Sequence, residues 1–193
     1  MKQRIRAKRS IGGFTLLEML VVIIIIGILF AIAAPGWDTL LSRQRVSSAR
    51  EQIAQTIRVA QSQARSTRSP RILAFDPSTT GKPRIAVGPY VPGTDLTTAA
   101  NSLNANTWVL LGNGNVNSGT LRMATSSSNS AISALVFDSN GTVAQIPNVP
   151  AAQTLPFGIT VARGNTTGTT TNRCVLVTTL LGTLRTDEKA NCP

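Results

Sequence analysis

The sequence predicts an α+β protein in which a long N-terminal helix packs on a globular domain of antiparallel β-strands. Residues 14–34 form an apolar run of 21 residues in which Glu18 is the single charge. Residues 46–64 repeat apolar side chains at three- and four-residue spacing, which is typical of an amphipathic helix. After Pro70 the chain changes to short β-type runs separated by turn residues. With 193 residues, one globular domain beyond the helix is expected.

Composition limits the chemistry available to this chain. It has no histidine and two cysteines, so a Cys/His zinc site or a His-based triad cannot be assembled. No catalytic residue, metal ligand or cofactor is predicted, and we do not expect an enzyme. The formal charge is +11, of which residues 1–13 supply five cations and no acid. This basic balance is compatible with anionic partners but does not require them.

The apolar run is long enough for a membrane span. At about 1.5 Å per residue, a helix over residues 14–34 covers roughly 30 Å, the thickness of a bilayer's hydrocarbon core. The cationic end before it is expected to stay in the cytoplasm while the chain after Ala34 is exported. Two ordinary alternatives are a secretory signal cleaved at Ala31-Ile32-Ala33 and a plain single-pass anchor. In the plain anchor Glu18 is a capping-box partner of Thr15.

A basic leader that ends in Gly13, followed by Phe14-Thr15-Leu16-Leu17-Glu18 and an apolar run, resembles the class III signal of type IV pilins and type II secretion pseudopilins. The resemblance implies cleavage between Gly13 and Phe14 by a prepilin peptidase and N-methylation of Phe14. It also implies assembly roles for Glu18 and for Pro35, a helix-distorting proline. Implied partners are the peptidase/methyltransferase, the bacterial inner membrane and other pilins or pseudopilins in a filament.

The chemistry of Glu18 agrees with this resemblance. A carboxylate deep in a bilayer costs about 2.5–3.5 kcal/mol on insertion scales, so it requires a partner. Cleavage creates one, because the new α-amino group of Phe14 is cationic. The resemblance implies that the amine of one subunit meets Glu18 of its neighbour in a filament. One segment then serves as both membrane anchor and polymerisation helix.

Four segments follow from this interpretation. They are a cleaved leader (1–13), a transmembrane and polymerisation helix (14–34), an amphipathic continuation (35–69) and an exported, periplasmic β domain (70–193). Pro35-Gly36 is expected to kink or locally melt the helix, which resumes from Trp37 to Thr67 and ends before Ser69-Pro70. Its predicted apolar stripe is Val46, Ala49, Ile53, Ile57, Ala60 and Ala64. A second arc holds Arg43, Arg50, Arg58, Arg65 and Arg68, either a solvated flank or a basic binding surface.

The β domain is expected to be built from antiparallel meanders, because no helix-length segment separates its strands. Asp138-Ser139-Asn140-Gly141 is predicted to form a hairpin turn. Residues 94–106, 126–130 and 163–172 are rich in Ser, Thr, Asn and Gly and are predicted to be exposed loops. The predicted strands are Arg71–Phe75, Arg84–Val87, Thr107–Leu111, Thr120–Met123, Ala134–Phe137, Thr142–Ile146, Gly158–Val161, Cys174–Thr178 and Gly182–Arg185.

Cys174 and Cys192 both lie in the exported part. An even pair in an oxidising compartment predicts a disulfide, although two free thiols are the alternative. Closing this loop is expected to stabilise the domain by about 3 kcal/mol.

The C-terminal residues indicate which group of pilins and pseudopilins the chain resembles. Arg173-Cys174-Val175-Leu176-Val177, Leu181-Gly182-Thr183-Leu184-Arg185 and the final Cys192 are similar to the C-terminal hairpin of H-type minor pseudopilins, the GspH/FimT family. The resemblance implies a subunit of a type IV pilus or type II secretion pseudopilus. Some pilus members bind DNA for uptake through a Gly-Arg-x-Arg element, in which this chain has Thr183 for the first arginine. Because that arginine is missing, any DNA binding is expected to be weak. The candidate residues for DNA contacts are Arg163, Arg173 and Arg185, around the C-terminal hairpin.

Overall fold

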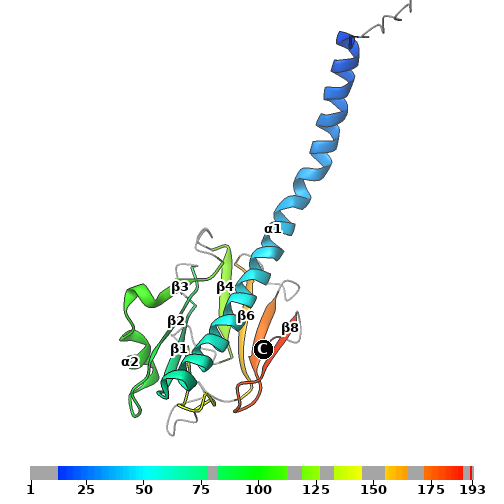
Figure 1. Ribbon diagram of the computed structural model, residues 1–193. Coiled ribbons are helices and arrows are strands. Elements are labelled where there is room, and N and C mark those ends of the chain that lie inside the picture. Colours follow the sequence, from blue (N-terminus) through cyan, green and yellow to red (C-terminus); the bar gives the residue numbers. More distant parts are fainter. Residues whose placement is uncertain are drawn as a thin grey trace, which may run out of the picture. The chain divides into compact units, whose positions relative to one another are not determined.

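The computed structural model describes residues 13–77, 82–112, 119–126, 133–144, 155–164, 172–188 and 192. Contacts divide the chain into two compact units, Met1–Leu40 and Leu41–Pro193. Helix α1 (Leu16–Thr67, 52 residues) contributes to both units (Figure 1). The second unit holds all of the strands and its own hydrophobic core.

Helix α1 remains helical through Pro35 and Gly36. The predicted alternative of local melting at these residues is therefore wrong. A proline removes one backbone donor and crowds one turn, so the hydrogen bonds of the flanking turns can carry the helix past it. The helix ends at Thr67, followed by Arg68 with a φ of 48° and then Ser69-Pro70, as expected.

The predicted apolar stripe of α1 is confirmed. All six of its residues are buried, at no more than 1% exposure, and Ala54 joins them at 4%. Alanine at several of these positions lets the helix backbone approach the sheets closely. The stripe packs against side chains from both sheets in one continuous cluster.

The strands form two four-stranded antiparallel sheets rather than one. Sheet A has the order β3-β2-β1-β5, and sheet B has the order β4-β6-β7-β8. Each contains a meander of consecutive strands, with β5 added beside β1 and β4 beside β6. The bounds are β1 Arg71–Asp76, β2 Arg84–Pro89, β3 Trp108–Leu110, β4 Leu121–Thr125, β5 Ser133–Phe137, β6 Phe157–Arg163, β7 Arg173–Val177 and β8 Leu184–Glu188.

Two strand predictions need correction. In the predicted strand Thr142–Ile146, Val143 makes only an isolated bridge to Phe137, and residues 145–146 lie outside the described part. The last strand begins at Leu184 and not at Gly182, because Gly182 closes the preceding turn with a φ of 75°. The Asp138–Gly141 turn is confirmed by a hydrogen bond from Gly141 N to Asp138 O of 2.9 Å.

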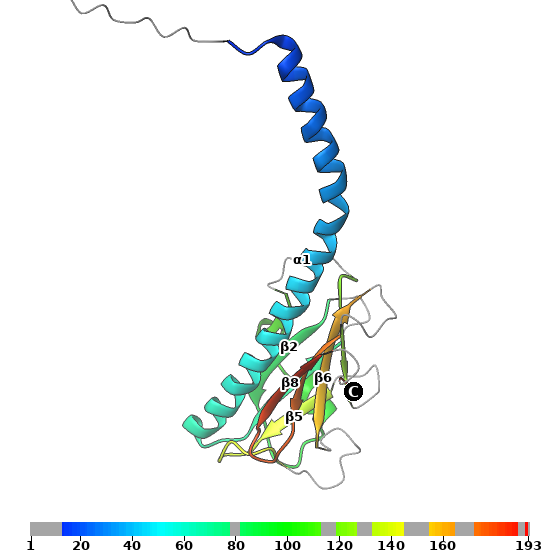
Figure 2. The same ribbon diagram turned by 90° about the vertical axis from the view of Figure 1, so that its right-hand side faces the viewer.

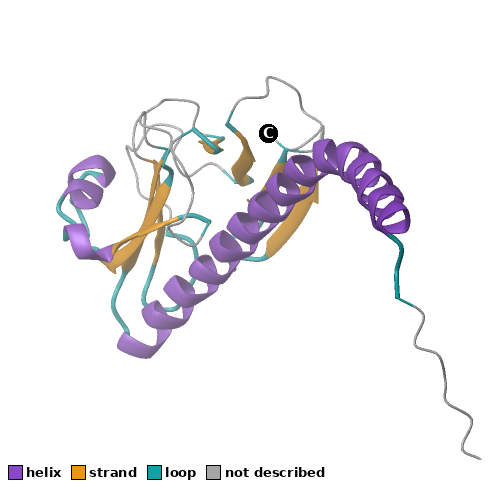
Figure 3. Ribbon diagram, turned by 90° about the horizontal axis from the view of Figure 1, so that it is seen from above, coloured by secondary structure: helices purple, strands orange, loops and turns teal. Residues whose placement is uncertain are grey.

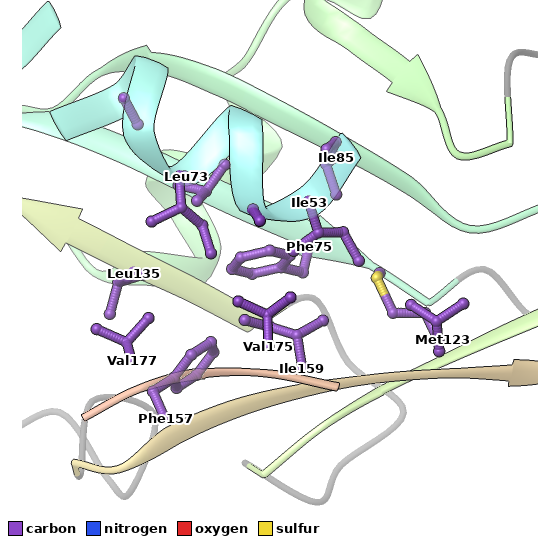
Figure 4. Packing of buried hydrophobic residues seen from close by; sticks show 14 of the residues in the cluster. Ile53, Leu73, Phe75, Ile85, Met123, Leu135, Phe157, Ile159, Val175 and Val177 are labelled. Carbon is purple, nitrogen blue, oxygen red and sulfur yellow. The ribbon is translucent and has the colours of Figure 1, made fainter. Parts of the chain in front are cut away.

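The main core lies between α1 and the two sheets. Figure 4 shows Ile53 of the helix above Phe75 of sheet A and Ile159 and Val175 of sheet B. The rings of Phe75 and Phe157 are 5.8 Å apart, so an aromatic contact joins the two sheets. Because both sheets share this core with the part of α1 after Leu40, that part and the sheets are expected to fold as one unit.

Residues 94–106 were predicted as a loop, and this prediction is wrong. They contain helix α2 (Leu96–Asn101) and the short 3₁₀ helix η1 (Ala105–Thr107). Asp95 caps α2 by accepting hydrogen bonds from the backbone of Thr97 and Thr98. The buried face of α2 contacts the side of sheet A that points away from α1, so this sheet lies between two helices (Figure 3). Much of the other two predicted loops, residues 127–130 and 165–171, lies outside the described part.

The predicted disulfide is present. Cys174, buried in β7, is bonded to Cys192, and their Cα atoms are 5.6 Å apart. The bond attaches Cys192, close to the end of the sequence, to a central strand of sheet B.

Candidate functional site

Gly13 and Phe14 lie immediately before the first turn of α1. Both are exposed, and Thr15 caps the helix by accepting a 3.2 Å hydrogen bond from Glu18 N to its Oγ1. This is the capping geometry expected from Thr15 and Glu18. A Cβ added to Gly13 meets no atom within 4 Å, so nothing in the folded chain requires glycine there.

The apolar side chains of residues 14–32 form an exposed surface on the described chain. Every large apolar residue from Phe14 to Ile32 is exposed, from 42% at Val22 to 84% at Leu16. Such a surface is large enough to require an apolar environment outside the chain. Glu18 is exposed in the first turn of the same helix. Within the residues that the structure describes, no helix meets the combined length and apolarity needed for a membrane crossing.

A charged cluster fastens α1 to sheet B in the second unit. Glu188 of β8 accepts a hydrogen bond from Arg50 of α1 at 3.3 Å and makes an ion pair with Arg173 of β7 at 3.2 Å. Arg173 also donates to the Ser47 hydroxyl, and Arg50 to Glu51. The guanidinium of Arg173 is thus engaged in an internal clamp. Figure 2 shows β8 beside the part of α1 that follows Leu40.

The remaining DNA candidates are not free cations either. Arg185 is 67% exposed but pairs with Asp187 at 2.9 Å. Arg163, at the end of β6, is half-buried and has an interaction partner. The structure therefore does not bring Arg163, Arg173 and Arg185 together as a row of unpaired arginines for phosphate binding.

The arginines of the predicted arc on α1 fall into two groups. Arg43, Arg58 and Arg68 are exposed, as a solvated flank requires. Arg50 joins the clamp, and Arg65 donates to the carbonyl of Asn140 at 3.0 Å. The arc is thus partly a solvated flank and partly a set of contacts that hold the β domain.

Glutamines on α1 hold loops that the sequence did not connect to the helix. Gln61 donates to the carbonyls of Gly141 (2.9 Å) and Leu181 (2.8 Å). Gln52 donates to the carbonyl of Leu110 and accepts from Gly112 N. These contacts join residues at least 58 positions apart, so no local pattern indicates them. The helix therefore fixes three turns as well as the core.

The Asp138–Thr142 turn is held by its own carboxylate. Burial raises the pKa of Asp138, but hydrogen bonds from the hydroxyl and backbone of Thr142 and from the backbone of Asn140 and Gly141 outweigh it. The pKa of Asp138 therefore lies below its ordinary value. Asp138 Oδ1 accepts from Asn140 N at 2.9 Å and from Thr142 N at 2.8 Å. The ionised carboxylate stabilises the turn that Gln61 and Arg65 contact.

The N-terminal residues match a known family. Residues 8–34 match the family model of the prokaryotic N-terminal methylation motif. This chain carries a prokaryotic N-terminal methylation motif. The matched range contains Gly13, Phe14 and Glu18 and the exposed apolar turns that follow them. No curated protein matches the sequence.

Two solved structures resemble the fold. Both are crystal structures of the type IV minor pilin FimU of Pseudomonas aeruginosa strain PAO1, each 18% identical to this chain. One covers 78% of this chain and 94% of its own with a TM-score of 0.49. The other covers 76% and 96% with a TM-score of 0.46.

Proposed function

We propose that this chain is a minor pilin or pseudopilin, a non-catalytic subunit of a type IV pilus or type II secretion pseudopilus. The observation that carries the proposal is the methylation motif at the start of α1, where the large apolar side chains of residues 14–32 are all exposed. Motif and helix together provide a processing site and an apolar surface that requires partners. The α+β architecture, with α1 packed on antiparallel sheets, supports the same assignment.

In the proposed life cycle, residues 14–34 first anchor the chain in the inner membrane, with the basic leader in the cytoplasm and the β domain in the periplasm. This anchor rests on the motif and on the sequence of the segment, which contains a single charge. A prepilin peptidase cleaves after Gly13, and the amine of Phe14 is methylated. The exposed position of Gly13 and Phe14, ahead of the helical hydrogen bonds, supports this site.

Assembly then moves the same apolar helix from lipid to a filament core. Glu18 requires a cationic partner in an apolar environment, and in the filament the Phe14 amine of a neighbouring subunit supplies it. The β domain stays on the outside, held on α1 by the core, the Arg50–Glu188–Arg173 clamp and the glutamine contacts. We place the chain with the H-type members on the strength of its C-terminal hairpin and disulfide.

Processing provides the first test. The mature protein should begin at N-methylated Phe14, and Gly13→Trp should retain the leader, as shown by intact mass and N-terminal sequencing. Because no atom crowds position 13, this substitution should leave the folded domain unchanged. A mature N-terminus at Ala34 would instead indicate ordinary signal peptidase cleavage and contradict the proposal.

Assembly provides the second test. Glu18→Ala should insert into the membrane, because it removes a costly charge, but should be missing from sheared filaments. Glu51→Gln is a control, since Glu51 is an exposed glutamate on the same helix outside the apolar run and glutamine keeps an oxygen that can accept from Arg50. Normal recovery of Glu18→Ala in filaments would show that the proposed pairing with the Phe14 amine is not needed.

A further inference from the structure

The turn between β7 and β8 exposes two leucines where a turn usually carries polar residues. Thr179, Leu180, Leu181 and Gly182 form this turn, closed by a hydrogen bond from Gly182 N to Thr179 O of 2.9 Å. Leu180 is 44% exposed and Leu181 is 68% exposed. Neither side chain belongs to the hydrophobic clusters of the domain. We call residues 179–182 the leucine turn.

Hydrogen bonds hold the leucine turn from several sides. Val143 N donates to the Leu180 carbonyl at 2.7 Å, and Gln61 donates to the Leu181 carbonyl at 2.8 Å. Within the turn, the hydroxyl of Thr179 donates to Thr183 Oγ1 and accepts from Thr183 N. The backbone is therefore fixed on α1 and on the Asp138–Val143 segment. The two leucine side chains therefore project from a fixed backbone, which suits a contact with a folded partner.

Arginines border the leucine turn on its helical side. Gln61, which holds the turn, has Arg58 one turn before it and Arg65 one turn after it on the same face of α1. Arg58 is exposed, and Arg65 is exposed while donating to the Asn140 carbonyl. No ion pair in the described part of the chain involves Arg58 or Arg65. The surface is thus an apolar pair beside unneutralised positive charge.

We propose that the leucine turn is a docking site for a different, acidic filament subunit, with an apolar recess for Leu180 and Leu181 and carboxylates that face Arg58 and Arg65. This inference rests on the proposed function and adds the surface and the chemistry of the partner. A second copy of this chain is disfavoured as the partner, because residues 14–193 carry 14 Lys and Arg against 8 Asp and Glu, a net charge of +6, and would bring like charges together. Arginine is enriched among the residues that dominate binding energy, and complementary charge selects the partner.

The test places a photo-cross-linking amino acid at position 181 of the full-length chain, expressed in source cells with their own filament subunits. Val91 is the matched control position, because it is also an exposed apolar residue at 68%. Position 181 should give an adduct with another polypeptide that carries an N-terminal methylation motif and a net negative charge, identified by mass spectrometry. Position 91 should give no such adduct.

Two further variants, each with the cross-linker at position 180, test the apolar contact and the charge contact separately. Leu181→Ser keeps the carbonyl that Gln61 binds, and it should reduce the adduct about tenfold or more. Arg58→Glu should do the same, whereas Arg43→Glu, an exposed arginine farther along the same arc, should not.

The outcomes distinguish this proposal from the proposed function. If the chain is processed and enters filaments but position 181 yields no adduct, the docking site is refuted and the pilin assignment stands. An adduct with a second copy of this chain, or with lipid, also refutes the acidic-subunit proposal. If the chain is neither processed nor found in filaments, the proposed function itself fails.

Discussion

Removing the Cys174–Cys192 disulfide should destabilise the β domain by an amount that depends on the length of the loop between the two cysteines. The best perturbation is Cys192→Ala, because Cys174 is completely buried and its free thiol then behaves as a small apolar side chain. Cys174→Ser would be a poorer choice, since it would bury a hydroxyl in the middle of sheet B. The variant therefore isolates the loss of the covalent link.

The expected magnitude comes from the separation of 18 residues between the two cysteines. A closed loop of this size restricts the unfolded chain by about 3 kcal/mol in the chain-entropy model. For a urea slope of about 2 kcal/mol/M, the unfolding midpoint should fall by roughly 1.5 M. The slope itself should change little if the folded core is unaffected.

The assay is equilibrium urea unfolding of the domain from Leu41 onward, which is a compact unit with its own core. Reduced wild type should match Cys192→Ala, and a reductant should have no effect on the variant. A midpoint shift that corresponds to less than about 1 kcal/mol would refute the loop-closure argument. Native protein in which both thiols react with an alkylating agent would refute the disulfide.

Three other predictions concern the core, the Asp138 turn and DNA. Ile57→Ala should cost about 2–5 kcal/mol because Ile57 is fully buried, whereas the exposed control Val59→Ala should change the unfolding free energy by less than about 0.5 kcal/mol; equal effects in urea unfolding would contradict the packing described above. Because the folded pKa of Asp138 is lowered, its carboxylate contributes stability above the ordinary Asp pKa, and this contribution is lost as the pH falls through the folded value. Asp138→Asn should therefore be less stable than wild type at neutral pH, with a difference that shrinks on acidification; a difference independent of pH would exclude this linkage. Duplex DNA should bind the domain weakly and in a salt-sensitive way, and Arg185→Ala should have little effect because Arg185 is paired with Asp187. Submicromolar binding at roughly 200 mM salt that is abolished by Arg185→Ala would instead support an uptake function.

The sequence alone determined the features that depend on near neighbours. The burial of the α1 stripe was predictable because residues three and four apart share one helical face. Most strands were predictable from short β-type runs between turns, and the hairpin turn from Asp138 to Gly141. Helix α2 was missed among Ser, Thr and Asn residues, although Asp95 as a cap and Leu96, Ala99 and Ala100 at helical spacing were a usable signal.

Only the tertiary structure decided how these elements combine and which polar residues meet. Strand order and the division into two sheets depend on pairings between segments far apart in the chain, which no local period encodes. Arg173 changed from a DNA candidate to part of a clamp because Glu188 and helix α1 are brought beside it. Leu181 became notable because Gln61, 120 positions away, fixes its backbone while leaving its side chain exposed. The apolar N-terminal run, with its single carboxylate, was evident from the sequence because it consists of consecutive residues and depends on no contact with distant parts of the chain.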